Sequence, residues 1–198
     1  MPSISISNRQ KVFQQDTEAA GSTTRTTRRG NEAGELFAWH LRPILAADLA
    51  AILRIQAACY PAELLEDAAT FQAKIDYAPD CNWLIEVDGD VQGYLFTHPW
   101  RGETPPALNR GDVAWPSDAD CFYLHDLAIH PAARGLKLST MLAGHALRWG
   151  EQQGFKLAML VAVGNAPAFW RKLGFTPCTK QDKSLAQYGN AVLMQKIL

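Results

Sequence analysis

Two basic residues lie where the pattern of apolar residues predicts the start of a helix. Arg134 and Lys137 follow a segment that ends at Pro131, and Gly135 stands between them. A helix start carries a partial positive charge and free N–H donors, so two cations there are unfavourable unless an anion binds. Glycine lets the backbone approach a ligand closely, and strand-to-helix turns commonly bind phosphate. The turn therefore indicates an anion site, with two solvated surface side chains as the alternative.

The elements on either side of this turn are well marked. Residues 121–129 are predicted to form a strand because aromatic and aliphatic residues dominate the segment. Pro131 ends the strand because proline has no N–H to give to a ladder. The helix after the turn is predicted to end near Gly154, and its apolar residues recur at helical spacing: Leu138, Met141, Leu142, Ala146 and Trp149.

Strands and helices alternate along the rest of the chain. Strands are predicted over residues 37–44, 82–87, 91–97, 157–163, 175–178 and 191–197, and helices over 48–60, 64–75 and 166–173. Asp88 and Gly89 join two strands as a hairpin, and the Pro-, Gly- and Asp-rich residues 101–120 form a long loop. The uninterrupted apolar residues 157–163 are typical of a strand buried on both faces. This order indicates a mixed α/β protein.

Composition excludes several classes of function. The chain of 198 residues has the size of one domain, and its net charge of −1 argues against non-specific nucleic-acid binding. No apolar run approaches the roughly 20 residues that span a bilayer, and the N-terminal residues lack the apolar core of a secretory signal. The four cysteines lack metal-type spacing. We therefore expect a cytoplasmic protein with reduced thiols that binds no metal, nucleic acid or membrane.

Residues 1–35 differ in composition from the rest of the chain. They are rich in Ser, Thr, Gln and Arg and poor in apolar residues, so we predict a disordered N-terminal extension, followed by one folded domain over residues 36–198. The Arg and hydroxyl content also fits a weak organellar transit peptide, although Asp16 and Glu18 count against that interpretation.

Two segments together resemble the GCN5-related N-acetyltransferase (GNAT) family. YLHDLAIHPAARGLKLS, residues 123–139, is similar to the family's strand and turn, in which Gln/Arg-x-x-Gly-x-Gly/Ala wraps the pyrophosphate of acetyl-CoA. Arg134 takes the first position, whereas Lys137 and Ser139 replace the small residues. NAPAFWRKLGF, residues 165–175, resembles the family's Asn-x-x-x-aromatic-aromatic-x-x-x-Gly-Phe helix and turn. The segments occur in the family's order, and the resemblance runs from about residue 36 to the end.

The resemblance implies an α/β (α+β) fold with a mixed, mainly antiparallel central sheet flanked by helices. It also implies an acetyl-CoA-dependent N-acetyltransferase that moves an acetyl group to a primary amine of a small molecule or peptide by direct attack. Many relatives are homodimers, so a homodimer is possible. The implied acetyl-CoA-binding residues are Leu127, Ala128, Ile129, Arg134, Gly135, Leu136, Lys137, Leu138, Ser139, Thr140, Asn165, Phe169 and Trp170.

The resemblance also places candidates for proton transfer. His125 stands where several relatives carry a glutamate, and a histidine can accept a proton from an ammonium group near neutral pH. A histidine that only hydrogen-bonds within the sheet is the alternative. The family's helix tyrosine, which protonates the leaving thiolate, is replaced by Trp170, whose indole N–H cannot give up its proton. Either water or another group then protonates the thiolate. Tyr188 is the second candidate for that acid, and a half-buried core tyrosine is its alternative role.

The acceptor side is predicted from charge and from the two helices that follow the first strand. Tyr60 and Glu63 could bind the amine at an acidic mouth, together with Glu66 and Asp67, unless these charges are only solvated. Asp126 could bind a cationic acceptor or play a structural role, and in a regular strand its side chain would point away from that of His125. An aromatic wall of the acceptor site, or anchors for the long loop, could come from His98, Trp100 and Trp115.

Two other classes of function remain open from the sequence. The replaced tyrosine, turn glycine and strand glutamate would also fit a CoA-binding sensor or adaptor with little or no turnover. A phosphate- or nucleotide-binding domain of another fold is the third option, but the chain has no Gly-x-x-x-x-Gly-Lys-Ser/Thr turn and no Rossmann glycine triplet.

Overall fold

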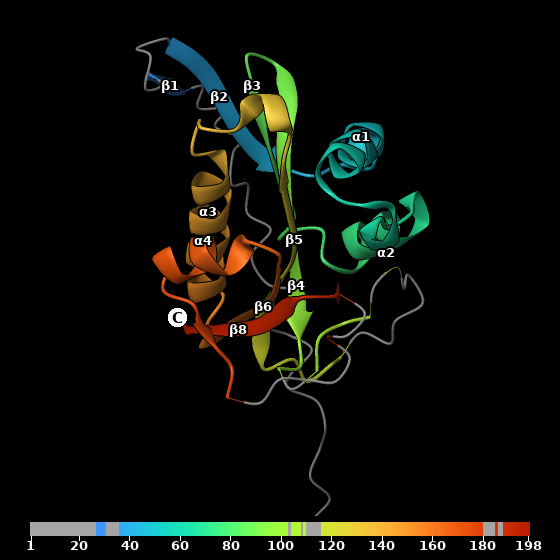
Figure 1. The fold of residues 1–198 in the computed structure, drawn as a ribbon, viewed down its shortest axis with the longest axis vertical. Coiled ribbons are helices and arrows are strands. Elements are labelled where there is room, and N and C mark those ends of the chain that lie inside the picture. The colour runs from blue at the N-terminus through green and yellow to red at the C-terminus, as the bar shows by residue number, and fades with distance from the viewer. Residues whose placement is uncertain are drawn as a thin grey trace, which may run out of the picture.

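The computed structural model describes residues 27–30, 36–102, 104–107, 109, 116–179, 185 and 188–198. Within these residues the strands form one eight-stranded sheet in the order β1-β2-β3-β4-β5-β6-β8-β7. All neighbouring strands pair antiparallel except β5 and β6, which are parallel. Helices α1 and α2 cover one face of the sheet, and α3 and α4 cover the other (Figure 1). The expected mixed, mainly antiparallel α/β fold is confirmed.

The elements lie close to their predicted positions. The strands are β1 (Thr27–Gly30), β2 (Leu36–Pro43), β3 (Trp83–Val87), β4 (Asp90–Trp100), β5 (Cys121–Ile129), β6 (Leu157–Val163), β7 (Thr176–Pro177) and β8 (Ala191–Ile197). The helices are α1 (Leu49–Cys59), α2 (Ala68–Tyr77), α3 (Leu138–Gln152) and α4 (Ala166–Lys172). The hairpin between β3 and β4 is confirmed, since Asp88 and Gly89 both have positive φ, of 50° and 92°.

Helix α2 begins later than the sequence pattern predicts. A helix was expected from residue 64, but α2 starts at Ala68, after a short 3-10 turn over Ala62–Leu64. Asp67 sets this start because its carboxylate accepts a hydrogen bond from the backbone N–H of Thr70 at 2.7 Å. Glu66 therefore precedes the helix and lies buried beneath it instead of on an exposed first turn.

The N-terminal extension contains one short strand. Residues 27–30 form β1, which pairs with residues 36–39 of β2. The prediction of disorder is therefore wrong for these four residues. Residues 1–26 and 31–35, to which the prediction of disorder and the transit-peptide interpretation mainly refer, lie outside the described residues.

The core has one layer on each face of the sheet. Leu138 and Leu142 of α3 pack against Phe122 and Leu124 of β5 on one face. On the other face the core is built from α1, α2 and the neighbouring strands, and its buried residues include Ile52, Ile55, Phe71, Tyr94 and Phe96. The central strands are thus covered on both sides, which fixes β5 in position between the two layers.

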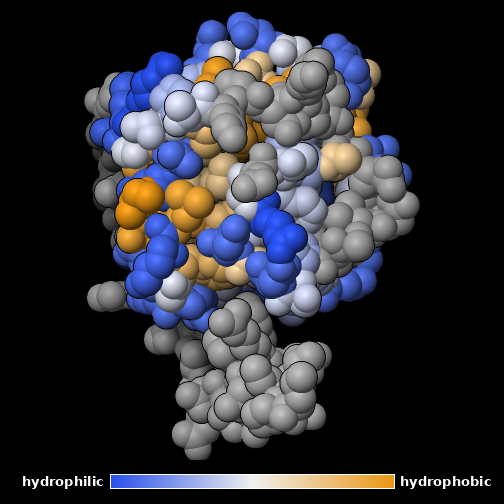
Figure 2. Space-filling model, turned by 90° about the horizontal axis from the view of Figure 1, so that it is seen from below, coloured by the Kyte–Doolittle hydropathy of each residue, from blue (hydrophilic) through white to orange (hydrophobic). Residues whose placement is uncertain are grey.

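The surface seen from below in Figure 2 has an apolar area among mostly hydrophilic residues. Of the large hydrophobic side chains in the described part of the chain, Leu45 and Ile197 are the most exposed. No helix among the described residues is long and apolar enough to cross a bilayer. All four cysteines are present as thiols.

Candidate functional site

A cavity opens where β5 and β6 separate. The two strands pair only at Phe122 with Ala158 and at Tyr123 with Met159. Beyond these pairs, a cavity of about 250 Å³ lies between the strands and reaches α4. Its walls include Leu124 and Leu127 of β5, Val161 and Val163 of β6, and Phe169 and Trp170 of α4. The cavity is therefore a gap in the middle of the sheet with mainly apolar walls.

The start of α3 borders this cavity through Ser139. Gly135 has a φ of +88°, and Lys137, the residue before the helix, has the left-handed φ of 61° without a capping bond from its side chain. The first amides of a helix have no acceptor within the helix, so those of Leu138 and Ser139 remain available as donors. Arg134 and Lys137 are exposed. The turn thus offers N–H donors and two cations beside the cavity.

Three titratable side chains form a cluster at one side of the cavity. Glu66 and His125 line the cavity, and Lys74 of α2 lies behind them. The Lys74 ammonium contacts Glu66 Oε2 directly, and Lys74 Nζ lies 2.7 Å from His125 Nε2. His125 Nε2 lies 3.3 Å from Glu66 Oε2. The side chains are 3–4% exposed, so this cluster is an ion pair and a histidine almost removed from water.

Burial and mutual attraction act on these groups in opposite directions. Burial raises the pKa of Glu66, but the attraction of His125 and Lys74 outweighs it, so the pKa falls well below its ordinary value of 4.5. Burial lowers the pKa of Lys74, and the attraction of Glu66 offsets part of that effect. Burial and the neighbouring His125 hold the pKa of His98 well below 6.5. Glu66 is therefore an anion at neutral pH, and His98 is neutral.

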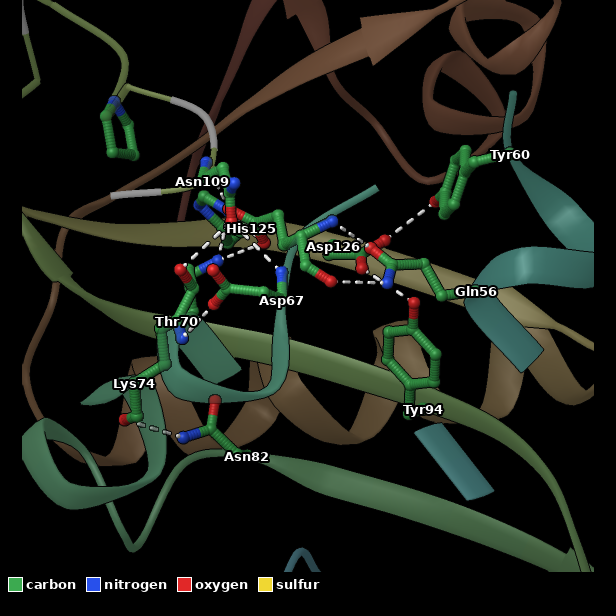
Figure 3. A network of polar contacts seen from close by, with 12 residues as sticks. Gln56, Tyr60, Asp67, Thr70, Lys74, Asn82, Tyr94, Asn109, His125 and Asp126 are labelled. Carbon is green, nitrogen blue, oxygen red and sulfur yellow. Dashed lines mark hydrogen bonds and ion pairs between the residues drawn. The ribbon is translucent and has the colours of Figure 1, made fainter. Parts of the chain in front are cut away.

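Hydrogen bonds from three segments fix Glu66 in place, as Figure 3 shows for the surrounding network. The Gln56 side chain of α1 accepts from the Glu66 backbone N–H at 2.7 Å and donates to the Glu66 carbonyl at 2.9 Å. The backbone N–H of Asn109 donates to Glu66 Oε1 at 2.9 Å. The Asn109 side-chain oxygen accepts from the N–H of Asp67 at 3.0 Å. The carboxylate therefore has a single, well-determined position.

His125 and Asp126 lie on the same face of the sheet. The register between β4 and β5 shifts at this point, so that Phe96 faces Asp126 while Thr97 faces Leu124. His125 is the extra residue of a β-bulge, which lets two successive side chains point to one side. The strand is therefore not regular here, which is the condition under which Asp126 would point away from His125.

Two tyrosines hold the buried carboxylate of Asp126. Tyr60 of α1 and Tyr94 of β4 each donate a hydrogen bond to it at 2.7 Å. Burial raises the pKa of Asp126, and these two hydrogen bonds offset part of that effect. Asp126 and Tyr60 both line the cavity, next to His125.

The structure brings together about half of the residues that the sequence indicated. The residues that line the cavity are Tyr60, His125, Asp126, Leu127, Ile129, Ser139, Phe169, Trp170 and Tyr188. The side chains of Ala128 and Leu138 are buried in the two core layers instead. The remaining predicted residues are not part of this wall: Glu63, Arg134, Gly135, Leu136, Lys137, Thr140 and Asn165.

The aromatic residues proposed for the acceptor side and for the acid have different surroundings. His98 and Trp100 pack together, with ring centroids 5.5 Å apart, but neither lines the cavity. Trp115 lies outside the described residues. Tyr188 lines the cavity, and its hydroxyl donates to the Pro106 carbonyl at 2.9 Å. Trp170 is buried and packs edge to face against Phe175 at 5.3 Å.

Sequence reasoning missed Lys74, Gln56 and Tyr94. Lys74 follows the buried Thr70 and Phe71 of α2 at helical spacing, so a lysine on the apolar face of this helix was the available signal. Gln56 is buried in α1, and no local signal marks it as the partner of Glu66. Within the described residues, no group of three or more His, Cys, Asp or Glu side chains could hold a metal ion.

One protein-family model matches most of this chain. The model of the acetyltransferase (GNAT) family matches residues 49–175. A search of curated proteins finds no match. Among solved structures, the loading GNATL domain of CurA from Lyngbya majuscula is 13% identical, with a TM-score of 0.68 over 80% of this chain and 97% of that chain.

Two further solved structures have similar folds. Naa50 from Arabidopsis thaliana, in complex with the bisubstrate analogue CoA-Ac-MVNAL, is 15% identical, with a TM-score of 0.61 over 80% of this chain and 97% of that chain. The ribosomal-protein-S18-alanine N-acetyltransferase from Escherichia coli is 17% identical, with a TM-score of 0.59 over 80% of this chain and 93% of that chain. At these identities the likeness shows the fold.

Proposed function

This chain belongs to the acetyltransferase (GNAT) family, and we propose that it transfers the acetyl group of acetyl-CoA to a primary amine of a small molecule or peptide by direct attack. The observation that carries this proposal is the cavity between β5 and β6, which runs from the start of α3 to the polar groups His125 and Asp126. The domain that performs the reaction is residues 36–198.

The cavity suits the shape and chemistry of acetyl-CoA. Its walls beside Leu127 and Ile129 are apolar, and β6 leaves this stretch of β5 without a paired strand, so the pantetheine arm can lie there. We assign the pyrophosphate to the amides from Gly135 to Thr140, where the helix start attracts an anion. Asn165 borders the other side of the arm, next to Phe169 and Trp170. Acetyl-CoA supplies the activated thioester carbonyl.

Arg134 and Lys137 add positive charge to this turn from outside the cavity. Both side chains are exposed, so their guanidinium and ammonium groups can reach phosphate oxygens from the surface. The first amides of α3 supply the short-range donors, and the two cations supply the longer-range attraction. Arg134→Ala is therefore expected to weaken acetyl-CoA binding without preventing turnover.

The acceptor amine is assigned to the part of the cavity lined by Tyr60 and Asp126. The buried carboxylate of Asp126 can attract an ammonium group, and Tyr60 fixes the orientation of that carboxylate. Glu63 is exposed at the end of the preceding segment, where it can attract a cationic acceptor before it enters. One of the similar structures is a ribosomal-protein-S18-alanine N-acetyltransferase, and another contains the bisubstrate analogue CoA-Ac-MVNAL, which supports an amine acceptor.

His125 and Tyr188 are the polar groups assigned to the reacting end of the cavity. His125 is buried beside Glu66, and Tyr188 keeps its proton at neutral pH because burial raises its pKa. Tyr188 is assigned as the hydrogen-bond donor to the leaving thiolate, the role that Trp170 cannot fill; its raised pKa makes it a weak acid, and its hydroxyl must first leave the Pro106 carbonyl. His125→Gln and Tyr188→Phe are both expected to lower kcat.

A CoA-binding sensor with little turnover is the second candidate. Trp170, which replaces the family's tyrosine, is buried against Phe175 and offers no exchangeable acid. Release of free CoA thiol, measured with a panel of small amines, polyamines and peptides, separates the two. We expect thiol release that depends on one class of amine. If the protein binds acetyl-CoA but releases thiol no faster than buffer does with every amine tested, the protein is a CoA-binding sensor instead of an acetyltransferase.

A further inference from the structure

The closed end of the cavity has an apolar wall that the reaction outlined above does not use. We propose that this wall is an acyl pocket, so that the protein accepts saturated acyl-CoA donors of three and four carbons as well as acetyl-CoA. The acyl pocket consists of the side chains of Leu95, Leu124, Leu160 and Trp170. The proposal rests on the proposed function, because it concerns the donor of the same transfer.

The acyl group of a bound donor lies at this closed end. Strands β5 and β6 pair at Phe122 and Tyr123, near the start of β5, and they separate toward the start of α3. The pyrophosphate is assigned to the start of α3, and the arm runs from there along Ile129 and Leu127. The thioester is at the far end of the arm, so the chain attached to its carbonyl points toward Leu124 and the paired end of the strands.

The two faces of the sheet give the closed end different walls. On the face that α3 and α4 cover, the four residues of the acyl pocket belong to one core layer and are between 0% and 6% exposed. The indole N–H of Trp170 is the one polar group among these side chains. The cavity wall on the opposite face includes the polar residues Glu66, Tyr123, His125 and Tyr188. An alkyl chain and a polar group are therefore directed to different sides.

The acyl pocket reaches beyond the gap between the strands. Leu95 belongs to β4, which lies on the far side of β5 from β6, and it pairs with Leu127. Since Leu95 lines the cavity, the space continues beneath β5 toward β4, on the face that α3 and α4 cover (Figure 1). An acetyl group places one methyl group beyond the carbonyl, whereas a propionyl or butyryl chain extends into this space.

The size and chemistry of the cavity suit such a chain. An apolar cavity of about 150 Å³ is large enough to bind benzene, and the cavity here measures about 250 Å³. Unfilled space between buried leucines weakens packing, because the wall atoms lack contacts on one side. An alkyl chain supplies those contacts. A carboxylate in the same place loses its hydration, and the four side chains offer it no cation.

The amine and the alkyl chain approach the thioester from opposite sides. The acceptor is assigned to Tyr60 and Asp126, and Tyr60 packs against the core layer on the face opposite the acyl pocket. The amine nitrogen forms a bond to the acyl carbonyl carbon, the carbon–sulfur bond breaks, and CoA leaves as a thiol with one proton of the amine. A chain of three or four carbons in the acyl pocket leaves the path of the amine open.

Calorimetric affinities for a series of acyl-CoAs test the acyl pocket without any amine. We expect butyryl-CoA to bind about tenfold more tightly than acetyl-CoA, because it buries two more CH₂ groups, and propionyl-CoA to lie between them. Succinyl-CoA has a chain of the same four carbons but ends in a carboxylate, so it should bind at least tenfold more weakly than butyryl-CoA. A butyryl-CoA affinity no higher than that of acetyl-CoA, or equal affinities for succinyl-CoA and butyryl-CoA, overturns the proposal.

Two substitutions at Leu124 change the size of the acyl pocket in opposite directions. Leu124→Phe fills the pocket and should remove the preference for butyryl-CoA over acetyl-CoA. Leu124→Ala enlarges it and should extend the preference to hexanoyl-CoA. Leu147→Ala is the matched control, because Leu147 is buried in the same core layer but does not line the cavity, and it should keep the wild-type order of affinities.

The results separate the acyl pocket from the proposed function. A wild-type order of affinities in both Leu124 variants overturns the acyl pocket, even if acetyl-CoA binds. Failure of CoA and of every acyl-CoA to bind to the wild type refutes the proposed function itself, and the acyl pocket with it.

Discussion

At the scale of single residues, Lys137 has a conformation that side chains other than glycine rarely adopt. Its φ of 61° places it in the left-handed region, which costs an L-residue roughly 1–2 kcal/mol. Its family counterpart is glycine, and its exposed side chain gives no capping bond that would compensate. The sequence identified the substitution, but the strain became visible only with the backbone.

Lys137→Gly is therefore expected to raise the free energy of unfolding by about 0.5–1 kcal/mol, because glycine adopts this φ without the clash. Urea unfolding measures the change. Lys156→Gly is the control, since Lys156 is also exposed and outside the helices but does not have a positive φ. Lys156→Gly should lower the free energy of unfolding. If Lys137→Gly lowers it as well, the left-handed conformation of Lys137 carries no strain.

A second prediction at this scale concerns Glu66 and acid. Its pKa in the folded protein is lowered from 4.5, so the stability that it contributes is present above pH 4.5 and is lost as the pH falls. Burial lowers the pKa of Lys74 from 10.5. Between pH 5 and pH 3 the wild type should lose about 2 kcal/mol more than Glu66→Gln Lys74→Met.

Urea unfolding at several pH values measures this difference. Asp48, whose pKa is lowered by Arg42 against the effect of burial, and Asp126, whose pKa is raised, contribute to the acid response of both proteins. They therefore largely cancel in the comparison. If the free energy of unfolding of the wild type and of the double variant falls in parallel with pH, the cluster does not stabilise the charged form of Glu66.

At the scale of elements, the sequence predicted most of the fold. The strand over residues 121–129 and the strand over 157–163 have the predicted bounds, because aromatic, β-branched and aliphatic residues suit a buried sheet. The bulge at His125 was not predicted, because no residue type in that segment requires it. The bulge arises from pairing with β4, a strand that is remote in the sequence, and it decides which side chains face the cavity.

Two glycines at opposite ends of α3 allow a matched test of the turn. Gly135 has a φ of +88° and Gly154 a φ of +87°, and an added Cβ would meet nothing within 4 Å at either position. Alanine at either position is therefore expected to cost about 1 kcal/mol of stability through strain alone. Only Gly135→Ala should weaken acetyl-CoA binding, by several-fold in calorimetry. Equal affinities of the two variants would place the pyrophosphate elsewhere.

At the scale of the whole molecule, the site was predicted less completely than the fold. Its motif residues are contiguous in sequence, so the resemblance could indicate them. Lys74 and His125 are 51 positions apart, and Glu66 and Asn109 are 43 apart. Nothing local marks such pairs, and they meet only because α2 lies over the middle of the sheet. The amine specificity, a homodimer and a cytoplasmic location remain predictions.

Acetyl-CoA should stabilise the whole domain by mass action. A ligand at 100 times its Kd adds about 2.7 kcal/mol, which corresponds to about 5–11 °C in Tm for a chain of this size. Differential scanning fluorimetry measures this rise, with ATP at the same concentration as a control that has phosphates but no thioester arm. A Tm that does not change at millimolar acetyl-CoA would contradict the assignment of the cavity.

The separation of β5 from β6 has a consequence for how such a protein can change over time. A sheet in which two neighbouring strands separate can bind a linear ligand in the gap between them. The backbone N–H and C=O groups along the gap can recognise this ligand, and every sequence supplies these groups. The side chains along the gap then determine which ligand shape is accepted and which reaction follows. They have less effect on whether a linear ligand binds. Chains that share fewer than one residue in five, as this one does with the similar structures, can thereby keep one fold while the side chains along the gap diverge.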